Sequence, residues 1–434
     1  MKRVLVAAAI SVAAARQVAW TDLPDAIHLR LQQAGVTAAS FPAFLDGLDR
    51  THAHRVRDGD LDHLIFYVLQ SRRFTSRPAI EPALSAKAFA DSRRVPDDVR
   101  ARIAAFLKAS ARADTDARAT YFRALVRTTW PAEGDREAGV AREYERAMRF
   151  LYDKEFVAQR GRDPAGAVES LYHSRGFSTD TAIEAGYVVY LGLAVLKAIE
   201  PDHRVRRVLI VGPGLDLAPR TGFIDSTPPE SYQPWAVIDA LAGLGLSRLD
   251  DVEVVGADIN PRVVDHLQTK RGAPPQLHLV SGLDASAGLT LEADYRDYFA
   301  KLGRAIGESR QESAATNGRL SKTVEVRPLV ARTISAERLD IVTERLSGPP
   351  FDLVIATNIL PYFDDVELTL ALANISSMLA PGGILLHNDL RPGLREIAAA
   401  AGLPLQQSRQ VPIARVKGAA PLVDTIFLHR RSGT

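Results

Sequence analysis

The stretch Val-Arg-Arg-Val-Leu-Ile-Val-Gly-Pro-Gly-Leu-Asp-Leu, residues 205–217, decides the fold of this chain. Its continuous aliphatic run predicts a strand that is buried on both faces of a parallel sheet. Gly212 and Gly214 come directly after this run. Because glycine has no Cβ, a turn of these residues can take left-handed dihedrals and let a ligand approach the backbone. The stretch therefore predicts the first strand and the nucleotide-binding turn of an α/β sheet.

Later segments continue the pattern in chain order. Residues 254–258 predict a second strand that ends in an acid, Asp258. Residues 351–358 predict another strand, and residues 379–386 predict a further one that opens with Leu-Ala-Pro-Gly-Gly. Residues 410–416 and 424–430 predict an antiparallel pair that closes the sheet, with Pro412 indicating a free edge or a late start.

This ordered set resembles the class I S-adenosylmethionine-dependent methyltransferases over residues 175–430. The resemblance implies a Rossmann-like sheet of seven mostly parallel strands with an antiparallel C-terminal hairpin, S-adenosylmethionine as the cofactor, and methyl transfer as the activity. The glycine turn would lie under the methionine part of the cofactor, Asp258 would hold the ribose hydroxyls, and Asp340 would reach the adenine. The cofactor contacts expected from the resemblance are Gly212, Pro213, Gly214, Asp216, Asp258, Ile259, Asp340 and Asn358.

The chain departs from the family's pattern in the turn. Ile210 stands where the family often has an acid, and Asp216 stands at the third glycine position; Asp216 could supply the missing carboxylate. Gly212 and Asp258 are 46 positions apart, against about 20 in a minimal nucleotide-binding unit. The inserted residues 219–235 are rich in proline and aromatic residues, so we expect an ordered loop over the turn and a helix that begins near Pro234.

A second insertion is expected at residues 283–322. It should contain a polar helix with Tyr295, Tyr298 and Phe299, followed by a mobile connection over residues 307–321 and a strand over residues 323–330.

The chain before the sheet is expected to form a helical N-terminal domain, residues 1–165, ahead of the cofactor domain at residues 166–434. Apolar residues recur at helical spacing over residues 25–34, 41–70, 85–90, 97–111, 114–127 and 138–156. Residues 1–20 look like a secretory signal and also fit an alanine-rich amphipathic helix. Since the cofactor is made and kept in the cytosol, we expect a cytoplasmic protein without stable membrane insertion; export stays open.

Composition excludes several classes of protein. The chain has 54 basic and 52 acidic residues, so no general affinity for nucleic acid is expected. It has no cysteine, which removes disulfides and thiolate chemistry. The cluster from His52 to His63 contains several possible ligands, but His52 and His54 would face different sides of a helix, so we expect no metal there.

Methyl transfer needs mainly alignment of the acceptor, and a base need not exist. If one exists, His387 at the end of a strand and Tyr362 are the candidates, although a histidine there is often only solvated and Tyr362 also suits packing. The expected substrate rim consists of Asp180, Glu184, Tyr232 and Trp235, where the alternative for Glu184 is a capped helix packed on the sheet. We expect a small-molecule acceptor; a catalytically silent nucleotide-binding module and an NAD(P)-dependent oxidoreductase stay as alternatives.

Overall fold

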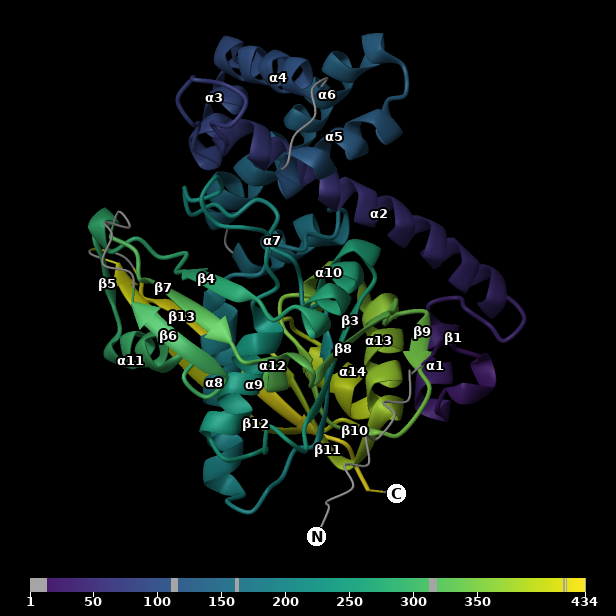
Figure 1. Ribbon diagram of the computed structural model, residues 1–434. Helices are drawn as coiled ribbons and strands as arrows, with labels where there is room; N and C mark the ends of the chain where they lie inside the picture. The colour runs from purple at the N-terminus through teal and green to yellow at the C-terminus, as the bar shows by residue number, and fades with distance from the viewer. Residues whose placement is uncertain are drawn as a thin grey trace.

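The computed structural model describes residues 14–110, 116–160, 164–311, 318–416, 418 and 420–433, in which helices stand above a twisted sheet (Figure 1). Residues 1–13, the greater part of the signal-like segment, lie outside the described residues. The helices before the sheet are α1 (Asp25–Gln33), α2 (Phe41–Gln70), α3 (Pro82–Ser92), α4 (Asp97–Ala109), α5 (Ala117–Thr129), α6 (Glu133–Tyr152) and α7 (Pro164–His173).

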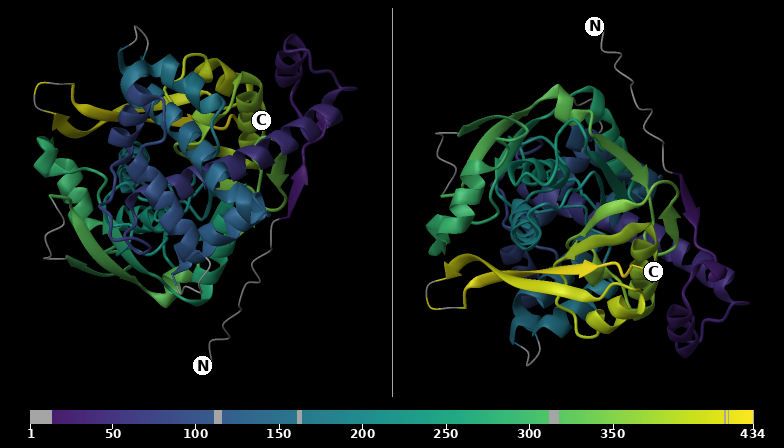
Figure 2. Two further views of the ribbon diagram at one scale, coloured as in Figure 1. Left: turned by 90° about the horizontal axis from the view of Figure 1, so that it is seen from above. Right: turned by 90° about the horizontal axis from the view of Figure 1, so that it is seen from below.

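The main sheet has eight strands in the order β5-β12-β13-β11-β10-β2-β3-β8. Its parallel strands are β2 (Arg207–Val211), β3 (Glu253–Asp258), β8 (Ile334–Arg338), β10 (Phe351–Ala356) and β11 (Leu379–His387). Its antiparallel strands are β13 (Leu422–Arg430), β12 (Leu405–Val416) and β5 (Leu289–Leu291). The antiparallel hairpin is present, and it extends well beyond the rest of the sheet (Figure 2).

The expected count of seven strands is wrong by one. The additional strand, β5, comes from the second insertion and pairs with residues 414–416 of β12. This pairing gives the exposed edge of the long hairpin strand backbone partners. Pro412 precedes the paired stretch, at an irregularity of the ladder between β12 and β13.

Two hydrophobic layers sandwich the sheet. Side chains of a strand alternate between its faces, so Val208 and Ile210 of β2 join one core cluster while Leu209 and Val211 join the other. The first layer contains α8 (Ile183–Ile199), α9 (Gln233–Gly243) and α11 (Ala293–Lys301); the second contains α1, α13 (Asp365–Met378) and α14 (Leu394–Ala400). The helix α9 begins next to Pro234, as predicted.

The second insertion and the residues that flank it form a small separate sheet, with strand order β4-β7-β6. Its strands are β4 (Gln276–Val280), β6 (Gly307–Gln311) and β7 (Ser321–Val326). The prediction of a connection over residues 307–321 is therefore wrong for its first part, because β6 finds backbone partners along β7. The predicted strand at 323–330 also ends early, since Pro328 starts the short helix α12 (Pro328–Ala331).

The front of the chain packs directly on the sheet. A third core cluster joins side chains of α2 to α6 with Leu215 and Leu217 of the glycine turn and with α10 (Pro261–Gly272). The described front part is not entirely helical, because β1 (Ala15–Gln17) pairs with β9 (Glu344–Leu346) beyond the main sheet. The domain boundary expected at residue 165 stays a prediction.

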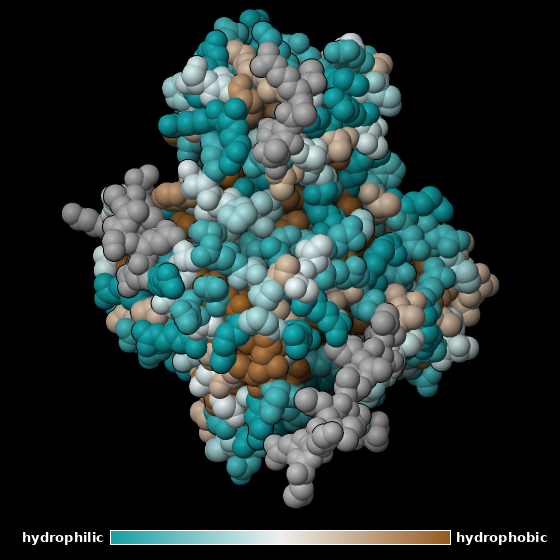
Figure 3. Space-filling view, viewed as in Figure 1, coloured by the Kyte–Doolittle hydropathy of each residue, from teal (hydrophilic) through white to brown (hydrophobic). Residues whose placement is uncertain are grey.

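The surface is mostly hydrophilic, with apolar patches near the centre of the face shown in Figure 3. Among the described residues, no helix combines the length and the apolar character that crossing a bilayer demands.

Candidate functional site

The glycine turn after β2 has the predicted backbone. Gly212 and Gly214 have φ angles of 66° and 72°, in the left-handed region that favours glycine. The N–H of Gly212 donates to the carbonyl of Ala257 at 2.8 Å, and the N–H of Gly214 is close enough to the carboxyl of Asp258 to lower its pKa. The turn and the acid are therefore adjacent at the carboxyl edge of the sheet, where ligands bind in open α/β sheets.

The bare faces of both glycines are covered by protein. A Cβ on Gly212 would overlap the Ile359 side chain, and a Cβ on Gly214 would overlap the Thr181 hydroxyl and the carbonyl oxygen of Thr179. We call residues 176–182, which run across the turn ahead of α8, the strap. The expectation of backbone left open to a ligand is not met at these two points, because the absence of a Cβ is used for close packing of the chain on itself.

Several hydrogen bonds hold the strap to the residues after the glycines. Leu215 donates its N–H to the carbonyl of Thr179 at 2.8 Å, and the Thr179 hydroxyl donates back to the carbonyl of Leu215 at 2.8 Å. Asp180, an expected rim residue, accepts from the N–H groups of Leu217 at 2.9 Å and Ala218 at 3.3 Å. Asp180 thus orders the turn rather than standing free at a rim.

Asp216 lies beside Asp180, and the two carboxyl groups share a hydrogen bond. Burial and the neighbouring Asp180 raise the pKa of Asp216 well above its usual value, against the opposing charge of Arg118. Arg118 of α5 holds the same region, with hydrogen bonds to the carbonyls of Leu217 at 2.7 Å and Ile224 at 2.8 Å and a further one to Thr227.

Asp258 ends β3 in the predicted position and is 7 % exposed. Its carboxylate accepts from the N–H of Asn260 at 2.8 Å, and the Asn260 amide donates to Asp60 of α2 at 3.1 Å. Burial raises the pKa of Asp258 to about 7, outweighing the N–H groups that lower it. Ile259, the next residue, is half-buried. Asp258 is therefore a buried acid with a raised pKa beside the glycine turn, and shifted pKa values of this kind are frequent at functional positions.

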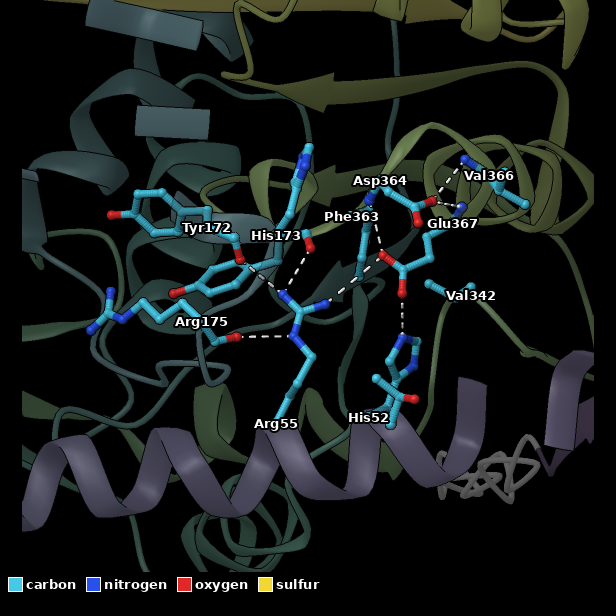
Figure 4. Close-up of polar contacts among 12 residues, drawn as sticks. His52, Arg55, Tyr172, His173, Arg175, Val342, Phe363, Asp364, Val366 and Glu367 are labelled. Atoms are coloured by element: carbon cyan, nitrogen blue, oxygen red, sulfur yellow. Dashed lines mark hydrogen bonds and ion pairs between the residues drawn. The ribbon is translucent and has the colours of Figure 1, made fainter. Parts of the chain in front are cut away.

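Asp340 follows β8, as expected for the adenine-contacting acid, but a histidine of the front part binds it. The Nδ1 and Nε2 atoms of His52 lie 2.6 Å from Asp340 Oδ2 and 2.9 Å from Glu367 Oε1. Burial alone would lower the pKa of His52, but the two carboxylates outweigh it and raise the pKa to about 9. Figure 4 shows the contact between His52 and Glu367 beside Arg55, which donates to the carbonyls of Tyr172 and Arg175.

Asn358 follows β10 and is exposed, with a φ angle of 61° that non-glycine residues seldom adopt. It forms a reciprocal pair with Asn388: the Asn358 N–H donates to Asn388 Oδ1 at 2.9 Å, and the Asn388 amide donates to Asn358 Oδ1 at 2.9 Å. The Asn388 amide also donates to Asp424 at 3.1 Å. The ends of β10 and β11 and the start of β13 thus share one polar cluster.

The two candidates for a base are both buried. His387 is 0 % exposed; its Nε2 is 2.9 Å from Nε2 of His429, and its Nδ1 accepts from the N–H of Asp389. Burial lowers the pKa of His387 well below its usual value. The Tyr362 hydroxyl accepts from the N–H of Ser178 at 3.3 Å, and burial raises the pKa of Tyr362 to about 12. In this geometry both side chains stabilise the fold around the edge.

The remaining rim candidates surround the second insertion. Glu184 accepts from Ser281 at 2.7 Å, from the N–H of Gly282 at 3.0 Å and from Tyr295 at 2.7 Å, so it joins α8 to the insertion. Tyr232 donates to the carbonyl of His278 at 3.2 Å. Trp235 is 1 % exposed within α9.

A narrow cleft lies beside the strap. Its walls are the starts of α8 and α9, the apolar face of the small sheet, and the turn before β6. Its interior volume of about 10 Å³ suits a single water molecule. The lining includes Tyr232, Gln233 and Trp235. Pro213 of the glycine turn is buried.

Several residues at this edge were not found from the sequence. Asp424 meets Asn388 only because an antiparallel strand returns beside β11. Gln233 donates to the Thr357 hydroxyl at 2.5 Å, a contact across 124 positions. Of these residues, only Asn388 could be placed at this edge from the sequence, because it follows the predicted strand at residues 379–386.

No family model and no curated protein matches this chain. Among solved structures, the CurJ carbon methyltransferase is 14 % identical with a TM-score of 0.32, covering 95 % of this chain and 100 % of that chain. Magnesium protoporphyrin IX methyltransferase (ChlM) from Synechocystis PCC 6803 with bound SAM is 12 % identical, with a TM-score of 0.31, over 63 % of this chain and 99 % of that chain.

The N-methyltransferase NodS from Bradyrhizobium japonicum WM9, in complex with S-adenosyl-L-homocysteine, is 14 % identical with a TM-score of 0.29, over 55 % of this chain and 84 % of that chain. The chain resembles class I S-adenosylmethionine-dependent methyltransferases.

Proposed function

We propose that this chain binds S-adenosylmethionine at the carboxyl edge of its sheet and transfers a methyl group to an acceptor that is a small molecule. The observation that carries the proposal is the position of Asp258, a buried acid at the end of β3, beside the left-handed glycine turn that follows the adjacent parallel strand β2. A buried acid beside a left-handed glycine turn is the arrangement that a nucleoside with two ribose hydroxyls needs.

The strand order supports a methyltransferase over the oxidoreductase alternative. In this sheet β13 runs antiparallel to its neighbour β11, whereas a nicotinamide-binding sheet would usually continue in parallel.

The residue types at this edge fit the cofactor, and their packing shows which segments must move for the cofactor to bind. Asp258 and Asn358 offer an acid and an amide at two strand ends. Ile359 and the strap cover the glycines, so binding requires both to shift. The strap is held by hydrogen bonds, and these can be replaced by hydrogen bonds to a ligand. Asp340 is paired with His52, so it is not available to contact the adenine.

The chain's own part in the reaction is alignment. The bound cofactor supplies a sulfonium methyl group that is already a strong electrophile. Asp258 would hold the ribose, and the Asn358, Asn388 and Asp424 cluster would orient the acceptor at the end of β10. No described side chain is assigned the role of base, because His387 and Tyr362 are buried in hydrogen-bonded positions.

Calorimetry with S-adenosylhomocysteine and with NADH tests the cofactor class. We expect binding of the former only, and faster association after Thr179→Val, which removes one hydrogen bond of the strap. Ser247→Ala, which removes a hydrogen bond to the carbonyl of Val205 at the opposite end of β2, serves as the matched control. Binding of NADH alone would overturn the proposal.

A catalytically silent module is the second candidate, and the covered glycines favour it. The two candidates separate in an assay with methyl-labelled S-adenosylmethionine and a panel of small acceptors. Binding of S-adenosylhomocysteine without transfer to any acceptor supports the silent module.

A further inference from the structure

Asp424 is an acidic side chain that no cation of the described chain neutralises. Its two carboxylate oxygens accept from the Asn388 amide at 3.1 Å and from the N–H of Thr425 at 2.7 Å. Within the part of the chain that the structure describes, Asp424 forms no ion pair with a basic side chain. By contrast, Asp389, which follows Asn388, is paired with Arg391 at 3.1 Å. Charges that are partly removed from water are normally paired, so Asp424 indicates a place for a cation that comes from a ligand.

The carboxyl group has the capacity for such a partner. Burial raises the pKa of Asp424 above its usual value, and only two uncharged donors, the Asn388 amide and the Thr425 N–H, oppose that effect. A carboxylate offers about four lone-pair sites, and the structure fills two of them. The residue is half-buried, so it keeps a part that faces solvent. A cation can therefore approach from solvent, whereas a ligand at the glycine turn must displace covering side chains and backbone.

Asp424 lies at the edge of the sheet where the cofactor is proposed to bind. β13 runs antiparallel to β11, and His387 at the end of β11 pairs with Phe427. Asp424 precedes Phe427 in β13, so the strand carries it past the end of β11, in the part of the hairpin that extends beyond the rest of the sheet (Figure 2). The Asn388 amide bonds both to Asp424 and to Asn358 Oδ1, just after β10. A cation on Asp424 is thus held beside the ends of two parallel strands.

Exposed apolar side chains flank the acid. Leu422 stands two residues before Asp424 in β13, so both side chains project from the same face of the strand, about 7 Å apart along it. Leu422 is 41 % exposed, and Leu390, two residues after Asn388, is 62 % exposed. A ligand that joins a cationic group to an apolar body would reach the acid and cover Leu422 at the same time.

We propose that Asp424 binds the methyl acceptor through a cationic amine, and that the acceptor is an amine with a hydrocarbon body. The ammonium group would donate to the free lone pairs of the carboxylate, and the hydrocarbon body would lie toward Leu422. Assignment of this amine as the acceptor rests on the proposed function, whereas its binding to Asp424 does not.

Hexylamine and hexan-1-ol are matched probes, because they share the hydrocarbon chain and differ only in the polar group, which is cationic in the amine at neutral pH. Saturation-transfer NMR on the full chain measures the affinity of each. We expect hexylamine to bind about fivefold more tightly than hexan-1-ol, which is the effect of one exposed ion pair. Equal affinities, or no saturable binding of hexylamine, would overturn the proposal.

Asp424→Asn removes the charge and keeps the shape of the side chain, so we expect it to fold and to bind the two probes equally. Asp202→Asn changes the net charge by the same amount at an exposed acid ahead of β2, on the opposite edge of the sheet, and should keep the preference for hexylamine. A preference that persists in Asp424→Asn, or that disappears equally in both variants, rules out Asp424 as the binding group.

Leu422→Ser tests the same site if Asp424→Asn does not fold. Because Leu422 is exposed, we expect this variant to fold and to bind hexylamine about threefold more weakly, since it loses apolar contact with the hydrocarbon chain. Unchanged hexylamine binding in Leu422→Ser would contradict the proposed placement of the ligand.

S-adenosylhomocysteine binding is measured by calorimetry on the same samples. Binding of S-adenosylhomocysteine without a preference for hexylamine overturns the amine site and keeps the proposed function. A preference for hexylamine without binding of S-adenosylhomocysteine keeps the amine site and overturns its assignment to the acceptor.

Discussion

The imidazole of His52 lies 2.6 Å from the carboxylate of Asp340, although the two residues are 288 positions apart. Because the other ring nitrogen contacts Glu367, the ring is an ionic link between α2, the loop after β8, and α13. Its three members are 1 %, 4 % and 6 % exposed, so water screens the link poorly.

This link predicts a loss of stability in alkali. The pKa of His52 is about 9 in the folded chain and about 6.5 when unfolded. The folded state therefore binds the proton more tightly, so the stabilisation is complete below about pH 6.5 and disappears as the pH rises through about 9. We expect the free energy of unfolding to fall by about 3 kcal/mol between pH 7 and pH 10. Denaturant titrations at several pH values measure this change.

His52→Gln should flatten that pH dependence and destabilise the chain at pH 7, because the buried carboxylates of Asp340 and Glu367 lose the charge of His52 and only Glu367 keeps Arg55 beside it. His54→Gln, an exposed position on the same helix, is the control and should preserve the slope. A slope that persists in His52→Gln would assign the effect to another group.

Asp258→Asn should separate stability from binding. The raised pKa of Asp258 means that its charge destabilises the fold above about pH 7, and that this cost disappears as the carboxyl is protonated toward pH 4. The free energy of unfolding of the variant should therefore be about 1–3 kcal/mol higher than that of the wild-type chain at pH 8 and equal to it at pH 4. It should also bind S-adenosylhomocysteine at least tenfold more weakly, as calorimetry would measure. A variant that binds normally removes Asp258 from the site.

Gly214→Ala should be much more harmful than the same change at a comparable glycine. The new Cβ would meet the carbonyl oxygen of Thr179, and backbone cannot rotate away as a flexible side chain can. We expect a loss of about 3 kcal/mol or more in the free energy of unfolding. Gly245→Ala is the matched control, since Gly245 has a φ angle of 65° and no atom within 4 Å of the built Cβ. Similar losses in both variants would show that the strap does not press on the turn.

Arg118→Leu should loosen the inserted loop. Arg118 donates to the carbonyls of Leu217 and Ile224 from a buried position, and leucine cannot satisfy these acceptors. We expect a loss of about 3 kcal/mol in stability and faster amide hydrogen exchange over residues 216–227. Arg127→Leu, on the exposed side of the same helix, should change neither. Unchanged exchange in Arg118→Leu would contradict the anchoring role.

Local patterns predicted the elements well. The helix at residues 41–70 has the same bounds as α2, and the glycine turn takes the left-handed backbone that its two glycines allow. α3 starts earlier than the spacing of its apolar residues suggests, since the Glu81 side chain accepts from the N–H of Leu84 and caps it.

Contacts between distant segments could not be predicted in the same way. Nothing near His52 in the chain indicates that Asp340 will neutralise it. Likewise, a glycine turn has the same sequence whether a ligand or a threonine fills the space beside it. The neutral pairing of His387 with His429 depends on β13 lying against β11, which only the complete sheet determines.

The helix α2 spans 30 residues, about 45 Å, and one rod of this length touches both halves of the molecule. Its first half bonds to Asp340, its second half bonds to Asn260, and its last turns enter the core of the front helices. A hinge between the halves would have to break this rod. The radius of gyration measured by X-ray scattering should therefore be the same before and after a ligand binds, with entry governed by local shifts of the strap and Ile359.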